Sequence, residues 1–203
     1  MPQGFAFSIQ NNFTTADMAR TVFQQFGPPY VVKPPSDGAS VGIIVADSIV
    51  VLPDAIGDIL DAYGAVLVEE FIRGHDATVG IIEDFRNEEL YALPPAHILA
   101  PLGARRIEWD HYNEELLKHT VPSNFSDEHK SALIEMARVA HRTLGLSHFS
   151  RADFILTTRG PYLLEVNSIP GLYPNAAFPH MLESVGSSIR EFAEHAIALA
   201  RGI

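Results

Sequence analysis

Apolar positions recur along the chain with two spacings, one typical of helices and one typical of strands. The first helical stripe begins after a threonine that can cap it, Thr14 or Thr15, and Gly27 with two prolines ends it. Residues three or four apart share one face of a helix, so this stripe predicts an amphipathic helix. Its apolar positions are Met18, Ala19, Val22, Phe23 and Phe26.

Three further segments have the helical spacing. Pro53 suits the first turn of a helix that ends at Gly64, and Ile56, Ile59, Leu60 and Tyr63 form its apolar side. Ser126 can cap a helix with an inner stripe of Leu133, Ala137, Ala140 and Leu144. The last predicted helix starts near Ser187. Its apolar positions are Ile189, Phe192, Ala193, Ala196, Ile197 and Ala200.

Short apolar runs between these helices predict strands. They lie at residues 30–33, 65–71, 77–83, 149–156 and 162–167. Residues 94–125 are rich in proline, histidine and polar residues, which favours a long functional loop. Helices and strands mix along the whole chain, and the expected boundary between two lobes lies near residue 68. The predicted division is therefore 1–68 and 69–203.

Composition narrows the class of protein. A hydrophobic content of 47% is enough for a packed core, and 14 Lys and Arg against 25 Asp and Glu give a formal charge of -11. Because phosphate backbones require a basic surface, this balance argues against a nucleic-acid binder. The chain has no cysteine, which excludes disulfide and thiolate chemistry, and no apolar run long enough to cross a membrane. We expect a cytoplasmic protein without membrane partners.

The segments FSRADFIL and YLLEVN carry the clearest candidate chemistry. If they form a hairpin centred on residue 159, Asp153 faces Glu165 and Arg151 faces Asn167, all on one face. Two opposed carboxylates repel each other unless a cation compensates, and Mg²⁺ prefers carboxylate and phosphate oxygens. The pattern therefore predicts a magnesium site at Asp153, Glu165 and Asn167, with Arg151 beside it for an anion. The alternative is a solvated polar face of an edge hairpin.

A second segment, VVKPPSDGASVG at 31–42, suggests phosphate binding. A strand delivers Lys33, and the Gly/Ser-rich loop after it can expose backbone N–H groups to phosphate oxygens. Farther along, VLVEEFIRGHD supplies two acidic side chains, Glu69 and Asp76, for the base and ribose of a nucleotide. Taken alone, the loop is more typical of a surface turn, and Glu69 is equally consistent with a charged strand end. Together with a magnesium site elsewhere in the chain, a nucleotide is the better explanation.

Four motifs in this order resemble the C-terminal ATP-grasp region of D-alanine–D-alanine ligases. They are KPPSDGASVG, VLVEEFIRGHD, FSRADF and YLLEVNSIPG. The resemblance covers the chain from about Pro2 and is weakest at 94–125. It implies an α+β ATP-grasp fold, in which two α+β lobes with antiparallel sheets enclose ATP. It also implies peptide-bond formation between two D-alanines through an acyl phosphate, a step of peptidoglycan biosynthesis, with ATP and Mg²⁺ or Mn²⁺ as cofactors.

The resemblance also assigns residues. Lys33 matches the phosphate-binding lysine, and Ser40 lies in the matching glycine-rich loop. Glu69 matches the adenine-contacting glutamate, and Asp76 stands where the family has a ribose-binding glutamate. The segment from Glu70 through Phe71 to Ile72 lies alongside the base. The matched metal ligands are Asp153, Glu165 and Asn167. Two positions match catalytic residues: Arg151 would stabilise the acyl phosphate, and Gly171 would open the loop that receives the second substrate.

Departures from the family pattern leave three readings. Ala39 and Ala176 replace two family serines, and the N-terminal domain that helps bind the first D-alanine is absent from the sequence. The first reading is a truncated D-alanine–D-alanine ligase. The second is an ATP-grasp ligase for another amino acid or peptide, completed by a partner chain with the missing domain or by a second copy of this chain. The third is a non-catalytic ATP-binding remnant.

Overall fold

The chain folds into two compact units. The computed structural model describes all residues except 11, 37–40, 102–116 and 203. The first unit is Met1–Ile72, and the second holds the remaining described residues, 73–101 and 117–202. The expected division lay between residues 68 and 69. In the structure the first sheet continues through Glu70, because that strand is paired on both sides.

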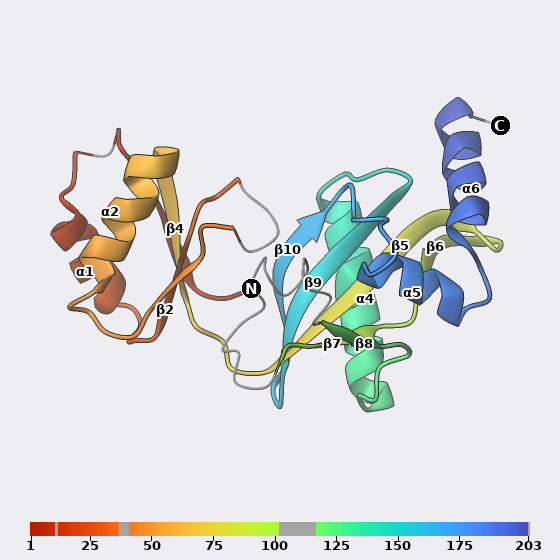
Figure 1. Cartoon of the computed structure of the whole chain (residues 1–203), viewed down its shortest axis with the longest axis horizontal. Coiled ribbons are helices and arrows are strands. Elements are labelled where there is room, and N and C mark those ends of the chain that lie inside the picture. The colour runs from red at the N-terminus through yellow and green to blue at the C-terminus, as the bar shows by residue number, and fades with distance from the viewer. Residues whose placement is uncertain (11, 37–40, 102–116, 203) are drawn as a thin grey trace. The chain divides into compact units, whose positions relative to one another are not determined.

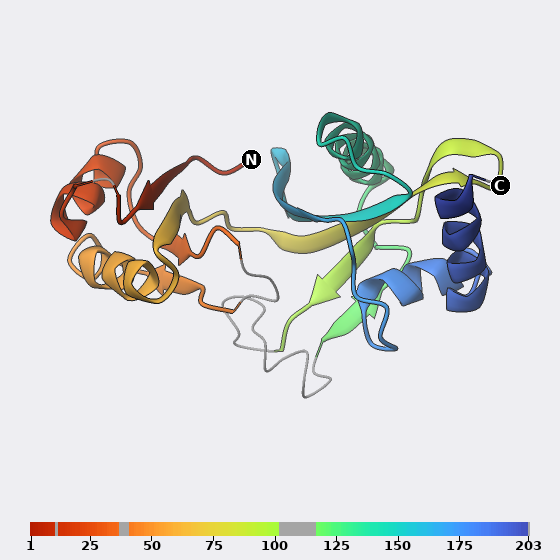
Figure 2. The same ribbon diagram turned by 90° about the horizontal axis from the view of Figure 1, so that it is seen from above.

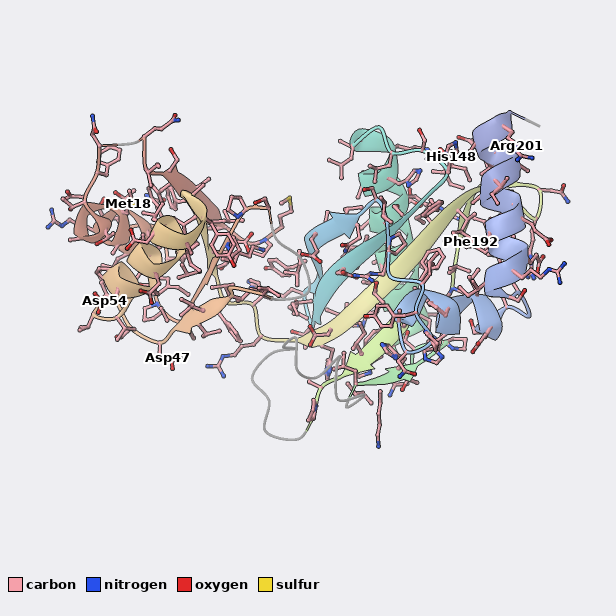
Figure 3. All side chains as sticks on the ribbon, turned by 45° about the horizontal axis from the view of Figure 1, so that its top comes forward. Met18, Asp47, Asp54, His148, Phe192 and Arg201 are labelled. Carbon is pink, nitrogen blue, oxygen red and sulfur yellow. The ribbon has the colours of Figure 1, made fainter. Side chains whose placement is uncertain are left out.

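The first unit is a four-stranded antiparallel sheet with two helices on one face (Figure 1). Its strands have the order β1-β4-β2-β3. They are β1 (Gly4–Ser8), β2 (Tyr30–Lys33), β3 (Ile44–Ala46) and β4 (Ala65–Glu70). The helices are α1 (Thr15–Phe23) and α2 (Leu52–Tyr63). Met18, labelled in Figure 3, lies in the core between helices and sheet together with Tyr30, Ile56 and Val68.

The second unit is built on a larger antiparallel sheet with the order β10-β9-β5-β7-β8, and β6 pairs with β5. Its strands are β5 (His75–Phe85), β6 (Glu88–Ala92), β7 (Ala96–Leu99), β8 (Lys118–Thr120), β9 (Phe149–Thr157) and β10 (Gly160–Asn167). Its helices are α4 (Asp127–Thr143), α5 (Ala177–Ser184) and α6 (Ile189–Arg201).

Helices cover the two faces of this second sheet differently. In Figure 2, α4 lies on one side of β5 and β9, and α5 lies on the other. On the α4 face, alternate strand residues such as Val79 and Phe154 pack against Leu133. On the opposite face, α5 and α6 enclose a second core that includes Phe178 and Phe192 (Figure 3).

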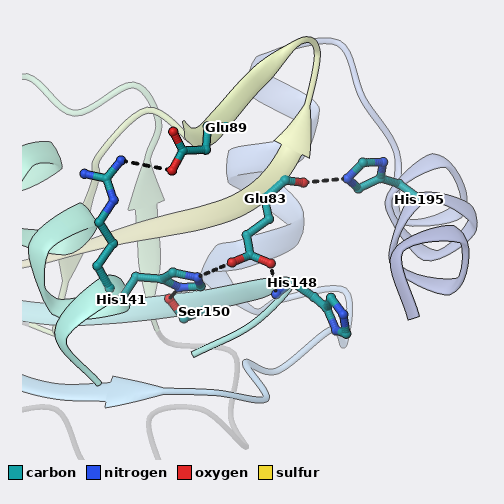
Figure 4. Close-up of polar contacts among 7 residues, drawn as sticks. Glu83, Glu89, His141, His148, Ser150 and His195 are labelled. Carbon is teal, nitrogen blue, oxygen red and sulfur yellow. Dashed lines mark hydrogen bonds and ion pairs between the residues drawn. The ribbon is translucent and has the colours of Figure 1, made fainter. Parts of the chain in front are cut away.

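A polar cluster around Glu83 joins the elements at one end of the second unit (Figure 4). The Glu83 carboxylate accepts a hydrogen bond from the backbone N–H of His148 and lies 3.4 Å from Nε2 of the buried His141. The other ring nitrogen of His141 is 2.8 Å from the Ser150 hydroxyl. His195 of α6 contacts the Glu83 backbone carbonyl at 2.7 Å. The Glu83 side chain therefore ties β5 to α4 and to His148, which directly precedes β9, and the Glu83 backbone carbonyl ties β5 to α6.

The α+β class predicted from the sequence is confirmed, with differences in detail. Phe23 and Leu144 belong to the predicted apolar stripes, but their side chains are 52% and 59% exposed. Each lies at the C-terminal end of its helix, beyond the residues that pack on the core. Residues 94–125, expected as a loop, contain β7 and β8. Among the described residues, no helix is long and apolar enough to cross a membrane.

Candidate nucleotide and metal site

The hairpin of β9 and β10 has the register that the sequence predicts at its functional end. Asp153 pairs with Glu165, and Arg151 pairs with Asn167. Near the turn the register differs, because Gly160 pairs with Thr157. A β-bulge between Leu163 and Glu165 adds one residue to β10 and corrects the difference.

The bulge determines which side chains of β10 leave the core. Leu163 and Val166 both pack against the core under α4, although they are three residues apart. In a regular strand, residues an odd number apart point to opposite faces. The extra residue therefore lets Leu163 and Val166 share the core face while Glu165 and Asn167 project from the other.

Asp153 is the centre of a polar cluster on that second face. Arg151 donates two hydrogen bonds to its carboxylate, of 2.9 and 2.6 Å, and the Thr78 hydroxyl donates a third of 2.6 Å. Thr78 is fully buried on β5, directly opposite Asp153. Such charge-assisted bonds hold the carboxylate in one orientation.

The donor set fits a hard divalent cation. The Asn167 side-chain nitrogen lies 3.0 Å from an oxygen of Asp153 and 3.2 Å from an oxygen of Glu165, so the three side chains converge. Two carboxylates and an amide oxygen are the ligands that Mg²⁺ accepts together with phosphate oxygens. Among the described residues there is no group of three or more His, Cys, Asp or Glu that would form an all-protein metal cage. The two carboxylates and the amide suit an ion that completes its coordination with phosphate oxygens and water.

Asp76 belongs to the same charged neighbourhood. It lies on β5, two residues before Thr78, and projects from the same face. Burial, together with the negative charge of Asp153, raises its pKa from the usual 3.8 to about 6. A carboxyl with this pKa carries a charge at neutral pH that the protein alone compensates poorly. A cation bound at the cluster would lower this cost.

The residues predicted to bind the base and phosphates lie in the first unit. Lys33 and Glu69 project from the face of the sheet opposite α1 and α2, and the Lys33 ammonium lies 2.7 Å from the Glu69 carboxylate. They are diagonal neighbours, because Lys33 pairs with Leu67 and Glu69 with Val31. Gly4 allows this packing, since a Cβ there would lie 2.9 Å from the Glu69 side chain.

The remaining predicted site residues that the structure describes lie at the end of β4, in the segment after it, and between β10 and α5. Glu70 ends β4, and its carboxylate accepts the backbone N–H of Gln3 at 2.9 Å. The Phe71 N–H donates to the carbonyl of Pro29, and Ile72 is the last residue of the first unit. Gly171 lies in the connection between β10 and α5. Ser40 and Ala39 lie outside the described residues.

Sequence reasoning missed two features of the site. The first is the Lys33–Glu69 ion pair, because it depends on the pairing of β2 with β4, which the sequence does not specify. The second is Thr78, whose hydroxyl fixes Asp153. The period of two on β5 that relates Thr78 to Asp76 was a usable signal, but the pairing of β5 with β9 was needed to bring Thr78 to Asp153.

Comparisons with known proteins give consistent results. The D-alanine–D-alanine ligase of Desulforudis audaxviator is 34% identical over 188 residues, which are 92% of this chain and 60% of that protein. The ligase of Carboxydothermus hydrogenoformans is 31% identical over 200 residues, 98% of this chain and 63% of that protein. This chain therefore spans about three fifths of the length of these curated relatives.

Solved structures show the same fold. The VanG D-Ala:D-Ser ligase of Enterococcus faecalis superimposes with a TM-score of 0.81 at 25% identity, over 98% of this chain and 56% of that one. The D-alanyl-alanine synthetase A of Vibrio cholerae gives 0.81 at 26% identity, over 97% of this chain and 59% of that one. The fold of the chain is thus the α+β ATP-grasp fold of these ligases. The family profile described as "D-ala D-ala ligase C-terminus" matches residues 3–198. The chain belongs to this family, as the motifs in its sequence indicated.

Proposed function

We propose that this chain is the ATP-binding and phosphoryl-transfer part of an ATP-dependent D-alanine–D-alanine ligase. The observation that carries the proposal is the convergence of Asp153, Glu165 and Asn167 beside Arg151 on one face of the second sheet. Family membership and the shared ATP-grasp fold support it. Small-molecule substrates, ATP with Mg²⁺ or Mn²⁺, and a cytoplasmic location are parts of the same proposal.

The proposed reaction has two steps. A carboxylate oxygen of the first amino acid attacks the γ-phosphorus of ATP, the bond to the ADP oxygen breaks, and an acyl phosphate forms. The amine nitrogen of the second amino acid then attacks the acyl carbon, releases a proton, and expels inorganic phosphate as the peptide bond forms. Each step concentrates negative charge on oxygens that preorganised cationic groups stabilise.

The residues of the second unit have separate parts in this chemistry. Asp153, Glu165 and Asn167 would hold a magnesium ion, which supplies charge neutralisation to the phosphates. Arg151 is held in place by its two bonds to Asp153 and keeps a positive charge near the reacting acyl and phosphoryl oxygens. The Thr78 hydroxyl holds the orientation of the Asp153 carboxylate by donating a hydrogen bond to it. Gly171 is proposed to open the loop that receives the second substrate.

The residues of the first unit are proposed to hold the nucleotide. Lys33 is the candidate for phosphate binding, with Ser40 in the loop that follows. Glu69 and the segment from Glu70 to Ile72 are the candidates for the base, and Asp76 of the second unit for the ribose. The close Lys33–Glu69 pair shows that each partner can be oriented by the other within this unit.

One observation favours a different second amino acid. Ala176 is the N-cap of α5, where its methyl side chain cannot bond to the free N–H groups of the first turn, and the family motif has a serine there. A ligase for another amino acid or peptide is therefore the second candidate. In either case a partner chain that supplies the part unmatched in the relatives, or a second copy of this chain, is proposed to complete the first-substrate site. A non-catalytic remnant would bind Mg-ATP without turnover.

The test is ligation by the chain alone and by the chain mixed with the separately produced unmatched part of the Desulforudis relative. We expect ADP and dipeptide to form only in the mixture, and Glu165→Gln to abolish both. Robust dipeptide formation by the chain alone would contradict the need for further residues. ADP release unaffected by Glu165→Gln would contradict the assignment of the metal site.

A further inference from the structure

A pair of histidines on the second unit lines a pocket that the proposed mechanism does not use. The rings of His119 on β8 and His180 on α5 have centroids 5.2 Å apart and planes tilted by 31°. With Val121, Glu183 and Ser184 they line a pocket of about 300 Å³. This volume is larger than an alanine methyl group requires.

The sheet register places this pocket on the same face as the metal cluster. His119 pairs with Ile98, which pairs with Asp76, which pairs with Ile155. Directly paired residues of neighbouring strands project from the same face. Ile155 is two residues beyond Asp153 on β9, so His119 and Asp153 share a face.

Packing of α5 on the sheet brings Phe178 close to the strand position opposite Arg151. Gly80 is the direct partner of Arg151 across β5 and β9. A Cβ at Gly80 would lie 2.8 Å from the Phe178 ring, so the glycine allows α5 to pack on the sheet at this point. His180 follows Phe178 on the same helix, whose core side is fully buried. His119, which lines the pocket, lies close enough to Arg151 for the charge of the arginine to lower the pKa of its ring.

The lining is polar, and the ring of His119 in it is uncharged at neutral pH. Burial, with the charges of His180 and Arg151, lowers the pKa of His119 to about 4, so its ring is neutral and offers one donor and one acceptor nitrogen. His180 lies 3.6 Å from Glu183, and the Ser184 hydroxyl donates to the carbonyl of Met181. A substrate hydroxyl group can donate to or accept from the neutral His119 ring, whereas a methyl group can do neither.

We infer that His119 and His180 select the second amino acid by its side chain, and that this side chain carries a hydroxyl group. The inference rests on the proposed ligase function, which brings the amine-bearing substrate to the acyl phosphate beside Arg151. It makes the histidine pair a specificity determinant rather than a part of the phosphoryl-transfer machinery. A site that pairs its polar groups with a substrate hydroxyl discriminates strongly against the analogue that lacks it.

The test compares D-serine with D-alanine, which differ by one hydroxyl group, and follows the histidine ring C–H signals by NMR with and without Mg-ATP. We expect D-serine to shift the signals of both rings saturably, and D-alanine to bind about tenfold more weakly or worse. His119→Phe and His180→Phe should each reduce D-serine binding to the level of D-alanine. His129→Phe on α4 is the matched control and should leave it unchanged.

Three outcomes decide the inference. Equal binding of D-serine and D-alanine overturns it, as does a D-serine response that persists in both His119→Phe and His180→Phe. Backbone amide spectra show whether each variant is folded. If one of the two variants is unfolded, the other one alone provides the test. Mg-ATP binding is measured on the same samples. If Mg-ATP binds and D-serine shifts neither ring, the inference fails alone. If D-serine binds selectively and Mg-ATP does not bind, the ligase proposal fails.

Discussion

Asp76 gives a prediction whose size can be worked from the structure. Its pKa is raised from 3.8 to about 6 by burial and by the charge of Asp153. Between these two pH values the folded chain holds a proton that the unfolded chain has released, so stability falls as pH rises from about 4 to about 6 and is then constant. Each pH unit is worth about 1.4 kcal/mol, which gives a total cost of about 3 kcal/mol at neutral pH.

The substitution Asp76→Asn removes this cost while keeping the size of the side chain. In the absence of divalent metal, we expect the variant to be more stable than the parent by up to about 3 kcal/mol at pH 8, and by less than about 1 kcal/mol at pH 4.5. Added Mg²⁺ should reduce the gain, because a cation at Asp153 lowers the cost of charging Asp76. Urea denaturation followed by far-UV circular dichroism measures the difference.

Glu135→Gln on the exposed face of α4 is the matched control, and its effect should stay within about 0.5 kcal/mol at both pH values. An Asp76→Asn variant that behaves like this control would refute the reasoning, because it would show that Asp76 and Asp153 do not share one poorly compensated neighbourhood. A gain that is independent of Mg²⁺ would contradict the link between Asp76 and the metal site.

Three other substitutions have defined expectations. Glu83→Ala should lower the free energy of unfolding by about 2–4 kcal/mol, because it removes the carboxylate that contacts the buried His141 and accepts the His148 N–H. The control Glu89→Ala, which removes an exposed carboxylate on β6, should lower it by less than about 0.5 kcal/mol in the same denaturation assay. Lys33→Met should weaken Mg-ATP binding about tenfold or more by calorimetry, and an equal loss in Lys130→Met would show that the effect is not local. Asp153→Asn should loosen Arg151 and lower nucleotide affinity without unfolding the chain, and unchanged binding would show that Asp153 is no ligand.

The sequence predicted the pairing of the candidate metal-site residues correctly, because their positions depend on the alternation of side chains along a strand. The pairing of Asp153 with Glu165 followed from the period of two and an assumed hairpin centre, and the structure confirms it. The turn between β9 and β10 is shorter than expected, which shifts the pairing by one residue, and the bulge in β10 shifts it back. Four helices, α1, α2, α4 and α6, and five strands, β2, β4, β5, β9 and β10, were also predicted from their apolar patterns, whereas α5, β1 and β6 were not.

The features that escaped prediction depend on contacts between distant segments. The three-residue strands β3 and β8 carry too little pattern to be recognised, and β8 is in a sheet only because it pairs with β7. The ion pair of Lys33 with Glu69 depends on the β2–β4 register. The contact between the tilted rings of His119 and His180 joins β8 to α5, which no local pattern signals.

Joint binding of a metal ion and ATP by the carboxylate cluster can be measured by calorimetric titration of ATP with and without Mg²⁺. We expect binding that requires Mg²⁺ and is lost or strongly weakened in Glu165→Gln, while the circular dichroism spectrum of this variant is unchanged. Binding that is the same without Mg²⁺, or no binding at millimolar ATP, would contradict it.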